Sequence, residues 1–201
     1  MIIYALILAL VSPNMYQDIA PMTATVQISV PYPKLMNPKA YGLSTCSAVF
    51  ISEDTLLTAA HCISDSRGRQ WIKTFEGKSY AVKIVKADLK KDLALLKTIS
   101  PIKHKFARFG QEVQRGDTVY TVNASHGWSR TYTTGIVNNV VIEDETNVTT
   151  ILHSASIAGG ASGSGLFNAK RELIGINVAT IRGFSEAVDI IEIRQFIDSR
   201  L

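Results

Sequence analysis

The sequence has few cysteines, no apolar run long enough to cross a membrane and little excess charge of one sign, and each shortage excludes a class of protein. Two cysteines cannot supply a zinc site built from four cysteines, although they can form one disulfide. The formal charge of +4, from 21 basic and 17 acidic residues, is too small for nucleic-acid binding to be the main activity. Thirteen glycines and six prolines, without a Gly-X-Y period or an internal repeat, exclude collagen-like, solenoid and low-complexity chains.

The first twelve residues form an apolar segment that ends at Ser12-Pro13. An eleven-residue helix is about 16 Å long, well short of a hydrocarbon core of about 30 Å, so this segment would not span a membrane alone. No basic residue precedes it and no clear small-residue cleavage site follows it. Three interpretations stay open for residues 1–12: an export signal, a short anchor that associates the chain with a membrane, or an ordinary N-terminal segment.

The rest of the chain has the apolar content of one globular domain, since 46% of its 201 residues are hydrophobic and 19% are charged. Short apolar runs separated by turn residues predict an all-β sandwich or barrel. Only the end of the chain has apolar residues at helical spacing, from Ile190 to Leu201, which predicts a short amphipathic helix. The predicted strands cover residues 23–30, 47–51, 55–58, 80–85, 93–97, 118–122, 133–142, 149–152, 165–167, 173–178 and 185–188.

Three local motifs carry side chains suited to chemistry, although each one alone is more typical of structure than of function. His61 ends a strand-like run, Asp92 opens an apolar run, and Ser162 lies in a glycine-rich turn. A serine hydroxyl needs a base to take its proton, and a neutral imidazole can do this near neutral pH. A carboxylate must in turn hold the imidazole in one tautomer and stabilise its charged form. Together the motifs predict a catalytic triad of His61, Asp92 and Ser162.

The glycines around Ser162 add a second element of the same chemistry. They let the backbone turn sharply, so that two N–H groups can point toward one position. We expect the backbone N–H groups of Gly160 and Ser162 to form an oxyanion hole for a tetrahedral intermediate.

These motifs resemble the three signatures of the trypsin-like serine proteases, in that family's order of His, Asp and Ser. The likeness is carried by Thr58-Ala59-Ala60-His61-Cys62, Asp92-Leu93-Ala94-Leu95 and Gly160-Ala161-Ser162-Gly163-Ser164. Outside the triad the chain is most similar to the HtrA-like and glutamyl-endopeptidase-like bacterial branches. The resemblance implies an all-β fold of two six-stranded antiparallel β-barrels with a short C-terminal α-helix. The active site would lie between the barrels.

The resemblance also implies a domain organisation and a disulfide. We expect a protease domain over residues 13–201, with two barrel subdomains that meet near residues 110–116, and no PDZ domain after it. In many trypsin-like proteases a disulfide brackets the histidine loop, as Cys46 and Cys62 would here; two reduced thiols are the alternative. A disulfide would favour a secreted or extracytoplasmic protein, and a membrane-anchored or virus- or phage-encoded one stays open.

The predicted substrate pocket departs from two known specificities of the family. Ser156 stands where trypsin carries an aspartate, and Asn177 stands where glutamyl endopeptidases carry a histidine, so neither Lys or Arg nor Glu is an expected preference. We expect Ser156 to lie at the pocket and its walls to come from residues 157–159 and 178–180, including Ile157, Val178, Ala179 and Thr180. Such walls would suit a small or aliphatic side chain.

The predicted function is a serine endopeptidase that acts on polypeptides through an acyl-enzyme, with no metal, no organic cofactor and no nucleic-acid partner. Ala161 cannot form the ion pair that holds this loop in trypsin-like zymogens after cleavage, so activity is not expected to depend on such cleavage. Because of this alanine a second interpretation stays open, in which the protein is a catalytically silent relative that binds a peptide or a partner in the cleft. A simple esterase is the third interpretation, and the oligomeric state is not predicted.

Overall fold

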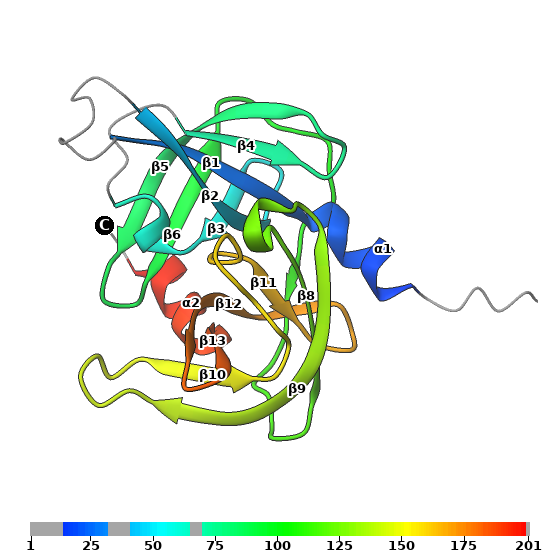
Figure 1. Cartoon of the computed structure of the whole chain (residues 1–201), viewed down its shortest axis with the longest axis vertical. Coiled ribbons are helices and arrows are strands. Elements are labelled where there is room, and N and C mark those ends of the chain that lie inside the picture. The colour runs from blue at the N-terminus through cyan, green and yellow to red at the C-terminus, as the bar shows by residue number, and fades with distance from the viewer. Residues whose placement is uncertain (1–13, 32–40, 65–69, 200–201) are drawn as a thin grey trace, which may run out of the picture.

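The computed structural model describes residues 14–31, 41–64 and 70–199, and its strands form two barrels, one above the other in Figure 1. The first barrel is closed, in the order β1-β2-β3-β6-β5-β4. All its neighbouring strands are antiparallel. They are β1 (Thr23–Pro31), β2 (Tyr41–Phe50), β3 (Thr55–Thr58), β4 (Gln70–Thr74), β5 (Ser79–Asp88) and β6 (Leu93–Thr98).

The second barrel has the order β11-β8-β9-β10-β13-β12 and closes through pairing of β11 with β12. A two-residue strand, β7, is added to it in parallel beside β12, so this seventh strand is a small departure from a purely antiparallel barrel. The strands are β7 (Arg108–Phe109), β8 (Thr118–Asn123), β9 (Thr131–Ile142), β10 (Thr149–His153), β11 (Gly165–Phe167), β12 (Glu172–Ile181) and β13 (Phe184–Asp189).

Apolar side chains form three clusters, one inside each barrel and one between the barrels. The cluster between them joins Leu57 and Leu93 of the first barrel to Phe167 and Ile176 of the second, all of them without solvent exposure. Close packing of this kind resists relative movement of the barrels. Side chains that meet across this interface are therefore held at fixed distances.

Two α-helices flank the barrels (Figure 1). The first, α1 (Met15–Ile19), continues into a 3₁₀ turn (Ala20–Met22). The second, α2 (Ile190–Asp198), is capped by Asp189, whose side chain accepts a hydrogen bond from the Ile191 N–H (2.8 Å). Lys86 of β5 contacts its C-terminal end through the Ser199 hydroxyl (2.9 Å), so this helix of the second barrel is tied to the first. In the described part of the chain, no helix is both long and apolar enough to cross a membrane.

The fold class, the two six-stranded barrels and the C-terminal helix are confirmed, and each predicted strand coincides with a strand of the structure. The expectation that only the end of the chain is helical was wrong, because α1 is a helix too. Five residues are too few to show a helical period. Strands β4 and β7 were also missed, since β4 has a single aliphatic residue and β7 only two residues.

Two predictions concern boundaries along the chain. The apolar segment of residues 1–12 lies outside the described residues, as does Leu201 at the end of the predicted helix. The strands of the first barrel end at Thr98, and β7 at residues 108–109 already pairs with the second barrel. The predicted subdomain boundary near residues 110–116 follows β7 directly.

Candidate active site

Strand order brings His61 and Asp92 together. Strands β3 and β6 are antiparallel neighbours, with Thr58 at the end of β3 paired with Ala94 near the start of β6. His61 follows β3 in a 3₁₀ turn (Ala60–Cys62), and Asp92 directly precedes β6. The end of one antiparallel strand and the beginning of its neighbour meet at the same edge of a sheet. Two side chains that are 31 residues apart in sequence therefore lie in contact.

The contact between them is a charge-assisted hydrogen bond. His61 Nδ1 lies 2.6 Å from Asp92 Oδ2, and the backbone N–H of His61 donates to Asp92 Oδ1 (2.8 Å). This hydrogen bond and the negative charge of Asp92 raise the pKa of His61 above its ordinary value near 6.5, against the opposing effect of partial burial. With Nδ1 held by the carboxylate, Nε2 is the ring nitrogen left to act as a base.

Ser162 approaches this pair from the second barrel. Its loop runs into β11, and the bonds from Gly163 N–H to the Asn177 carbonyl (2.7 Å) and from Asn177 N–H to the Ser164 carbonyl (2.8 Å) fix that loop against β12. Cys62 Sγ lies 3.8 Å from His61 Nε2 and 3.7 Å from the Ser162 carbonyl oxygen. The predicted serine and histidine thus flank the same sulfur atom from opposite barrels.

The Ser162 hydroxyl does not point at the histidine in this structure. Ser162 Oγ donates to the Val178 carbonyl (3.2 Å), and the described residues show no hydrogen bond between Ser162 and His61. Catalytic hydrogen bonds are often long or misaligned in ligand-free enzymes. A rotation about the Ser162 Cα–Cβ bond would turn the hydroxyl away from the Val178 carbonyl and toward His61.

The Cys46–Cys62 disulfide is formed, which confirms the predicted pairing. It joins β2 to the turn that carries His61, across 16 residues of sequence. Cys46, Cys62 and His61 also lie close enough together to suggest a metal site. Sulfur atoms joined in a disulfide have no thiolate to offer a metal, so this group is a structural crosslink beside the histidine.

Two backbone N–H groups in the serine loop are free to bind an anion. Among the described residues, neither the Gly160 N–H nor the Ser162 N–H has an acceptor, whereas the intervening Ala161 N–H donates to the Ala158 carbonyl (2.9 Å). Gly160 has φ +99°, and a Cβ atom there would lie 2.3 Å from the Ala124 carbonyl oxygen. Only glycine fits this position, because both the backbone conformation and the close approach exclude a side chain.

Ser47 of β2 holds the serine loop from the first barrel. Its hydroxyl donates to the Gly160 carbonyl and accepts from the Ala124 N–H, both at 2.9 Å, and its backbone N–H donates to the Ser162 carbonyl (2.8 Å). Ser47 is 1% exposed, and its bond to the Ala124 N–H is fully buried. One buried serine therefore connects three segments around the two free N–H groups.

The segment after β8 holds the other side of the loop. The His126 N–H donates to the Gly159 carbonyl (2.7 Å), and the Ala158 N–H donates to Ser125 Oγ (3.2 Å). Fixing the Gly159 carbonyl fixes the orientation of the Gly160 N–H, because both belong to one planar peptide unit. These neutral hydrogen bonds hold a loop in which fully buried Ala161 offers no charge for an ion pair.

A buried polar network supports the loop from inside the second barrel. Asn177 donates through Nδ2 to Ser164 Oγ (2.9 Å) and to Thr121 Oγ1 (3.1 Å), and its Oδ1 lies 2.8 Å from His153 Nε2. Burial lowers the pKa of His153 to about 4, so the ring is neutral at physiological pH and donates to Asn177. Asn177 is thus a structural anchor of the residues that follow Ser162.

A cavity of about 200 Å³ adjoins the serine. Four of the five residues predicted for the substrate pocket line it, while Ser156 instead lines a neighbouring cavity that contains His153. The residues around the 200 Å³ cavity are Ile157, Ala158, Gly159, Ser162, Val178, Ala179 and Thr180. Its walls are mostly small or aliphatic.

A second cavity, of about 390 Å³, adjoins His61 and Asp92 and shares Val178 and Ala179 with the first. Its charged lining residues are the three acids Asp92, Glu143 and Glu186 and the two bases Lys90 and Lys91. Burial and the nearby Glu143 carboxylate raise the pKa of Glu186 to about 7. The cavity beside the histidine is thus lined by carboxyl groups and by two lysines.

The supporting residues were not visible in the sequence. Ser47 and Ser125 have no motif of their own, and Asn177 stood out only for its place in a family comparison. Their partners lie far along the chain, 113 residues away for Ser47 and Gly160. The one sequence feature that could have drawn attention to Ser47 is its position directly after Cys46, which the predicted disulfide joins to the residue after His61.

Comparison with known sequences finds one family across most of the chain. The sequence model of the trypsin-like peptidase domain matches residues 46–176. A DegP-like protein of Chlamydia trachomatis, named as a probable periplasmic serine endoprotease, is 31% identical over 140 residues, 66% of this chain and 28% of that protein. Serine protease HTRA1B of Danio rerio is 28% identical over 194 residues, 92% of this chain and 40% of its own length.

Comparison with solved structures supports the fold. An HtrA-type protease solved with a decapeptide superposes with a TM-score of 0.80 at 23% sequence identity, over 92% of this chain and 66% of that one. The likeness confirms the two-barrel architecture. The chain spans well under half of the length of the curated relatives described above.

Proposed function

Because this chain belongs to the trypsin-like peptidase family, we propose that it is a serine endopeptidase that forms an acyl-enzyme on Ser162. The observation that carries the proposal is the assembled site itself. The His61–Asp92 hydrogen bond of 2.6 Å lies beside a serine loop whose Gly160 and Ser162 N–H groups have no other acceptor. A base and an anion-binding pair at one serine are the parts that acyl transfer needs.

In the proposed reaction, His61 Nε2 takes the proton of Ser162 Oγ as that oxygen attacks the substrate carbonyl. Asp92 stabilises the imidazolium that forms, and the N–H groups of Gly160 and Ser162 donate to the new oxyanion. His61 then gives the proton to the leaving amine, and a water molecule repeats the sequence to release the acid. A substrate N–H that takes the Val178 carbonyl as its acceptor would release the Ser162 hydroxyl toward His61.

We propose that the 200 Å³ cavity receives the side chain on the acyl side of the scissile bond. Its walls of Ile157, Ala158, Val178 and Ala179 favour a small or aliphatic side chain. No charged side chain is among the lining residues, which argues against a Lys, Arg or Glu preference.

We further propose that the protein works in an extracytoplasmic compartment. Its Cys46–Cys62 disulfide would persist in an oxidising environment, and the chlamydial relative is named as periplasmic. Polypeptides are its proposed substrates, in keeping with the names of its relatives.

The test is intact-mass analysis after incubation of the full chain with a fluorophosphonate, in parallel with Ser162→Ala. We expect one adduct on the wild type, located on Ser162 by peptide mapping, and none on the variant. A folded, disulfide-closed protein without an adduct would contradict the proposal and favour a silent peptide-binding relative. Ester hydrolysis without cleavage of any protein or peptide substrate would favour a simple esterase.

A further inference from the structure

The turn that carries Asp92 is tied to the second barrel by an ion pair. Asp92 is the last residue of the turn between β5 and β6, in the first barrel. Lys91 directly precedes it, and Lys91 Nζ lies 2.5 Å from Oε2 of Glu192 in α2, the helix that follows the last strand of the second barrel. The chain next to Asp92 is therefore held by a contact from outside its own barrel.

The carboxylate of Glu192 is itself held through both oxygens. Oε2 faces Lys91, and Oε1 accepts a hydrogen bond from the Thr149 N–H at the start of β10 (3.1 Å). Burial alone would raise the pKa of Glu192, but the hydrogen bonds from Lys91 and Thr149 lower it below its ordinary value, so the group is ionised at neutral pH. The side chains of Lys91 and Glu192 are 20% and 8% exposed, so solvent screens this pair less than one on the open surface.

Lys91 is held at its backbone as well as at its ammonium group. The ammonium also donates to Gln195 Oε1 (2.9 Å), three residues after Glu192 on the same face of α2. The Lys91 N–H donates to Asp88 Oδ1 (3.0 Å), the oxygen that also accepts from the Lys90 N–H (2.9 Å). Asp88 thus closes the turn from within, while Lys91 joins it to α2.

The backbone of Asp92 has a conformation that depends on such support. Its φ is +51°, in the left-handed region that is uncommon for residues with a side chain. A residue stays in this region where the surrounding structure holds it there. In this conformation the Asp92 carboxylate contacts His61 Nδ1 (2.6 Å) and the His61 N–H (2.8 Å), and its carbonyl accepts from the Ala60 N–H (3.2 Å). A shift of the turn would therefore change the contact between His61 and Asp92.

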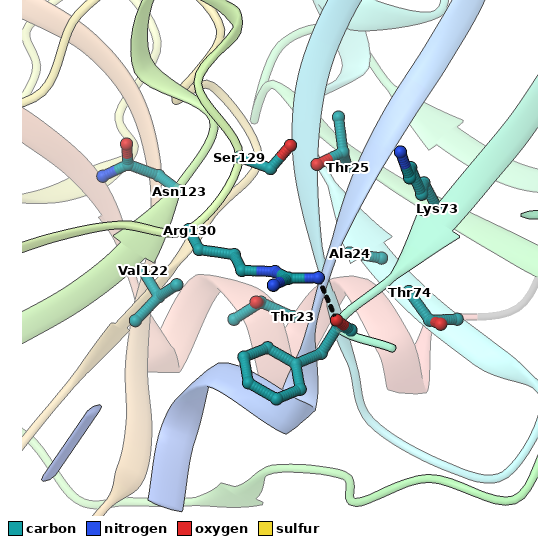
Figure 2. Close-up of a pocket in the computed structure, with 10 residues that line it drawn as sticks. Thr23, Ala24, Thr25, Lys73, Thr74, Val122, Asn123, Ser129 and Arg130 are labelled. Atoms are coloured by element: carbon teal, nitrogen blue, oxygen red, sulfur yellow. Dashed lines mark hydrogen bonds between the residues drawn. The ribbon is translucent and has the colours of Figure 1, made fainter. Parts of the chain in front are cut away.

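Two other contacts between the barrels serve as a comparison. Arg130, directly before β9, donates to the Phe75 carbonyl of the first barrel at the cavity of about 230 Å³ in Figure 2. Among the described residues, that cavity and the one beside His61 share no lining residue. Lys86 of β5 binds the C-terminal end of α2, away from Glu192 in its first turn. Of the three contacts, the one through Lys91 adjoins the proposed triad.

We propose that Glu192 is a positioning residue for Asp92 and acts through Lys91. The pair holds the turn of residues 89–92 relative to the second barrel, which carries Ser162, and so keeps the His61–Asp92 hydrogen bond in place. The effect on reaction rate rests on the proposed function. Glu192 is not among the described residues that line the cavities beside Ser162 and His61, so its loss should slow the chemistry without weakening binding.

The test measures fluorophosphonate labelling of the full chain at several probe concentrations, which separates the maximal rate from the half-saturating concentration. In Glu192→Gln we expect the maximal rate to fall about tenfold or more, since a misplacement of about 1 Å can cost about 100-fold, and the half-saturating concentration to stay unchanged. Lys91→Met should lower the maximal rate by a similar factor. The double variant should label no more slowly than either single variant, because both changes remove one interaction.

The matched control is Lys86→Met, which removes an equal charge and another bond between the β5–β6 hairpin and α2. It should lose stability in urea unfolding but label at the wild-type rate. An equal fall in rate in Lys86→Met would show that any loosening of α2 slows labelling, which overturns the proposal. Wild-type rates in both Glu192→Gln and Lys91→Met overturn it too, as do losses that add up in the double variant.

A spectroscopic measurement tests the positioning without catalysis. Because the His61–Asp92 bond is short and charge-assisted, its Nδ1–H proton should give a proton NMR signal far downfield of the backbone amides. We expect this signal to move upfield or broaden in Glu192→Gln and Lys91→Met and to persist in Lys86→Met. An unchanged signal in the first two variants overturns the proposal. A wild type that shows these signal changes in its variants but is never labelled would instead overturn the proposed function and leave the positioning role in place.

Discussion

The Ser47 hydroxyl offers the sharpest test of how the serine loop is held. In Ser47→Ala, the Gly160 carbonyl and the Ala124 N–H each lose a hydrogen bond of 2.9 Å, the first partly buried and the second buried. An unsatisfied buried group costs about 1–3 kcal/mol, so we expect the free energy of unfolding to fall by about 3 kcal/mol. The backbone bond from Ser47 to the Ser162 carbonyl remains.

The same change should slow the chemistry. Loss of one oxyanion donor lowers kcat by about 10²–10³ in serine proteases. Here the Gly160 N–H is kept but less firmly oriented, so we expect a smaller loss in kcat/KM, about 10- to 100-fold. The rate of fluorophosphonate labelling measures this loss directly, and urea unfolding of the same variant measures the stability.

A matched variant separates the two effects. Thr98→Val removes another buried hydroxyl of the first barrel, which donates to the Ser100 carbonyl (2.8 Å) away from the serine loop. It should lose stability and keep the labelling rate of the wild type. If Ser47→Ala labels as fast as Thr98→Val, the hydroxyl does not orient the oxyanion hole and the reasoning fails.

Three further predictions concern the histidine, the disulfide and Glu186. Because Asp92 raises the pKa of His61, and only the neutral ring accepts the serine proton, Asp92→Asn should move the acid limb of the pH profile of kcat/KM to lower pH and reduce kcat about 10⁴-fold; an unmoved acid limb would contradict the assignment. Replacing Cys46 and Cys62 by serine should lower the free energy of unfolding by about 3 kcal/mol in urea titrations, whereas an unchanged midpoint would show that the crosslink is not stabilising. The raised pKa of Glu186 means that the folded state keeps a proton which the unfolded state loses, so stability falls as the pH rises from the ordinary glutamate value to about 7. Glu186→Gln should therefore be more stable than the wild type at pH 8 but not at pH 4, and equal gains at both would refute this origin.

The sequence alone predicted the features of this protein that depend on residues close together in the chain. His61, Asp92 and Ser162 each stand in a short motif, and alternating apolar runs marked most strands of both barrels. Antiparallel pairing of β3 with β6 then places His61 beside Asp92. Such features can be predicted from sequence because turn preferences and the spacing of apolar residues depend on residues that are close together in the chain.

Only the tertiary structure revealed what surrounds these residues. Ser47 reaches Gly160 across 113 residues, Ser162 points toward Val178 rather than His61, and Lys73 and Arg130 line one cavity between the barrels. Ala161 suggested a loop without its usual support, and the structure supplied that support from Ser47 and the segment after β8. These contacts depend on how two separately closed barrels pack against each other. Packing of distant surfaces leaves no periodic or local mark in the sequence, which is why it could not be read there.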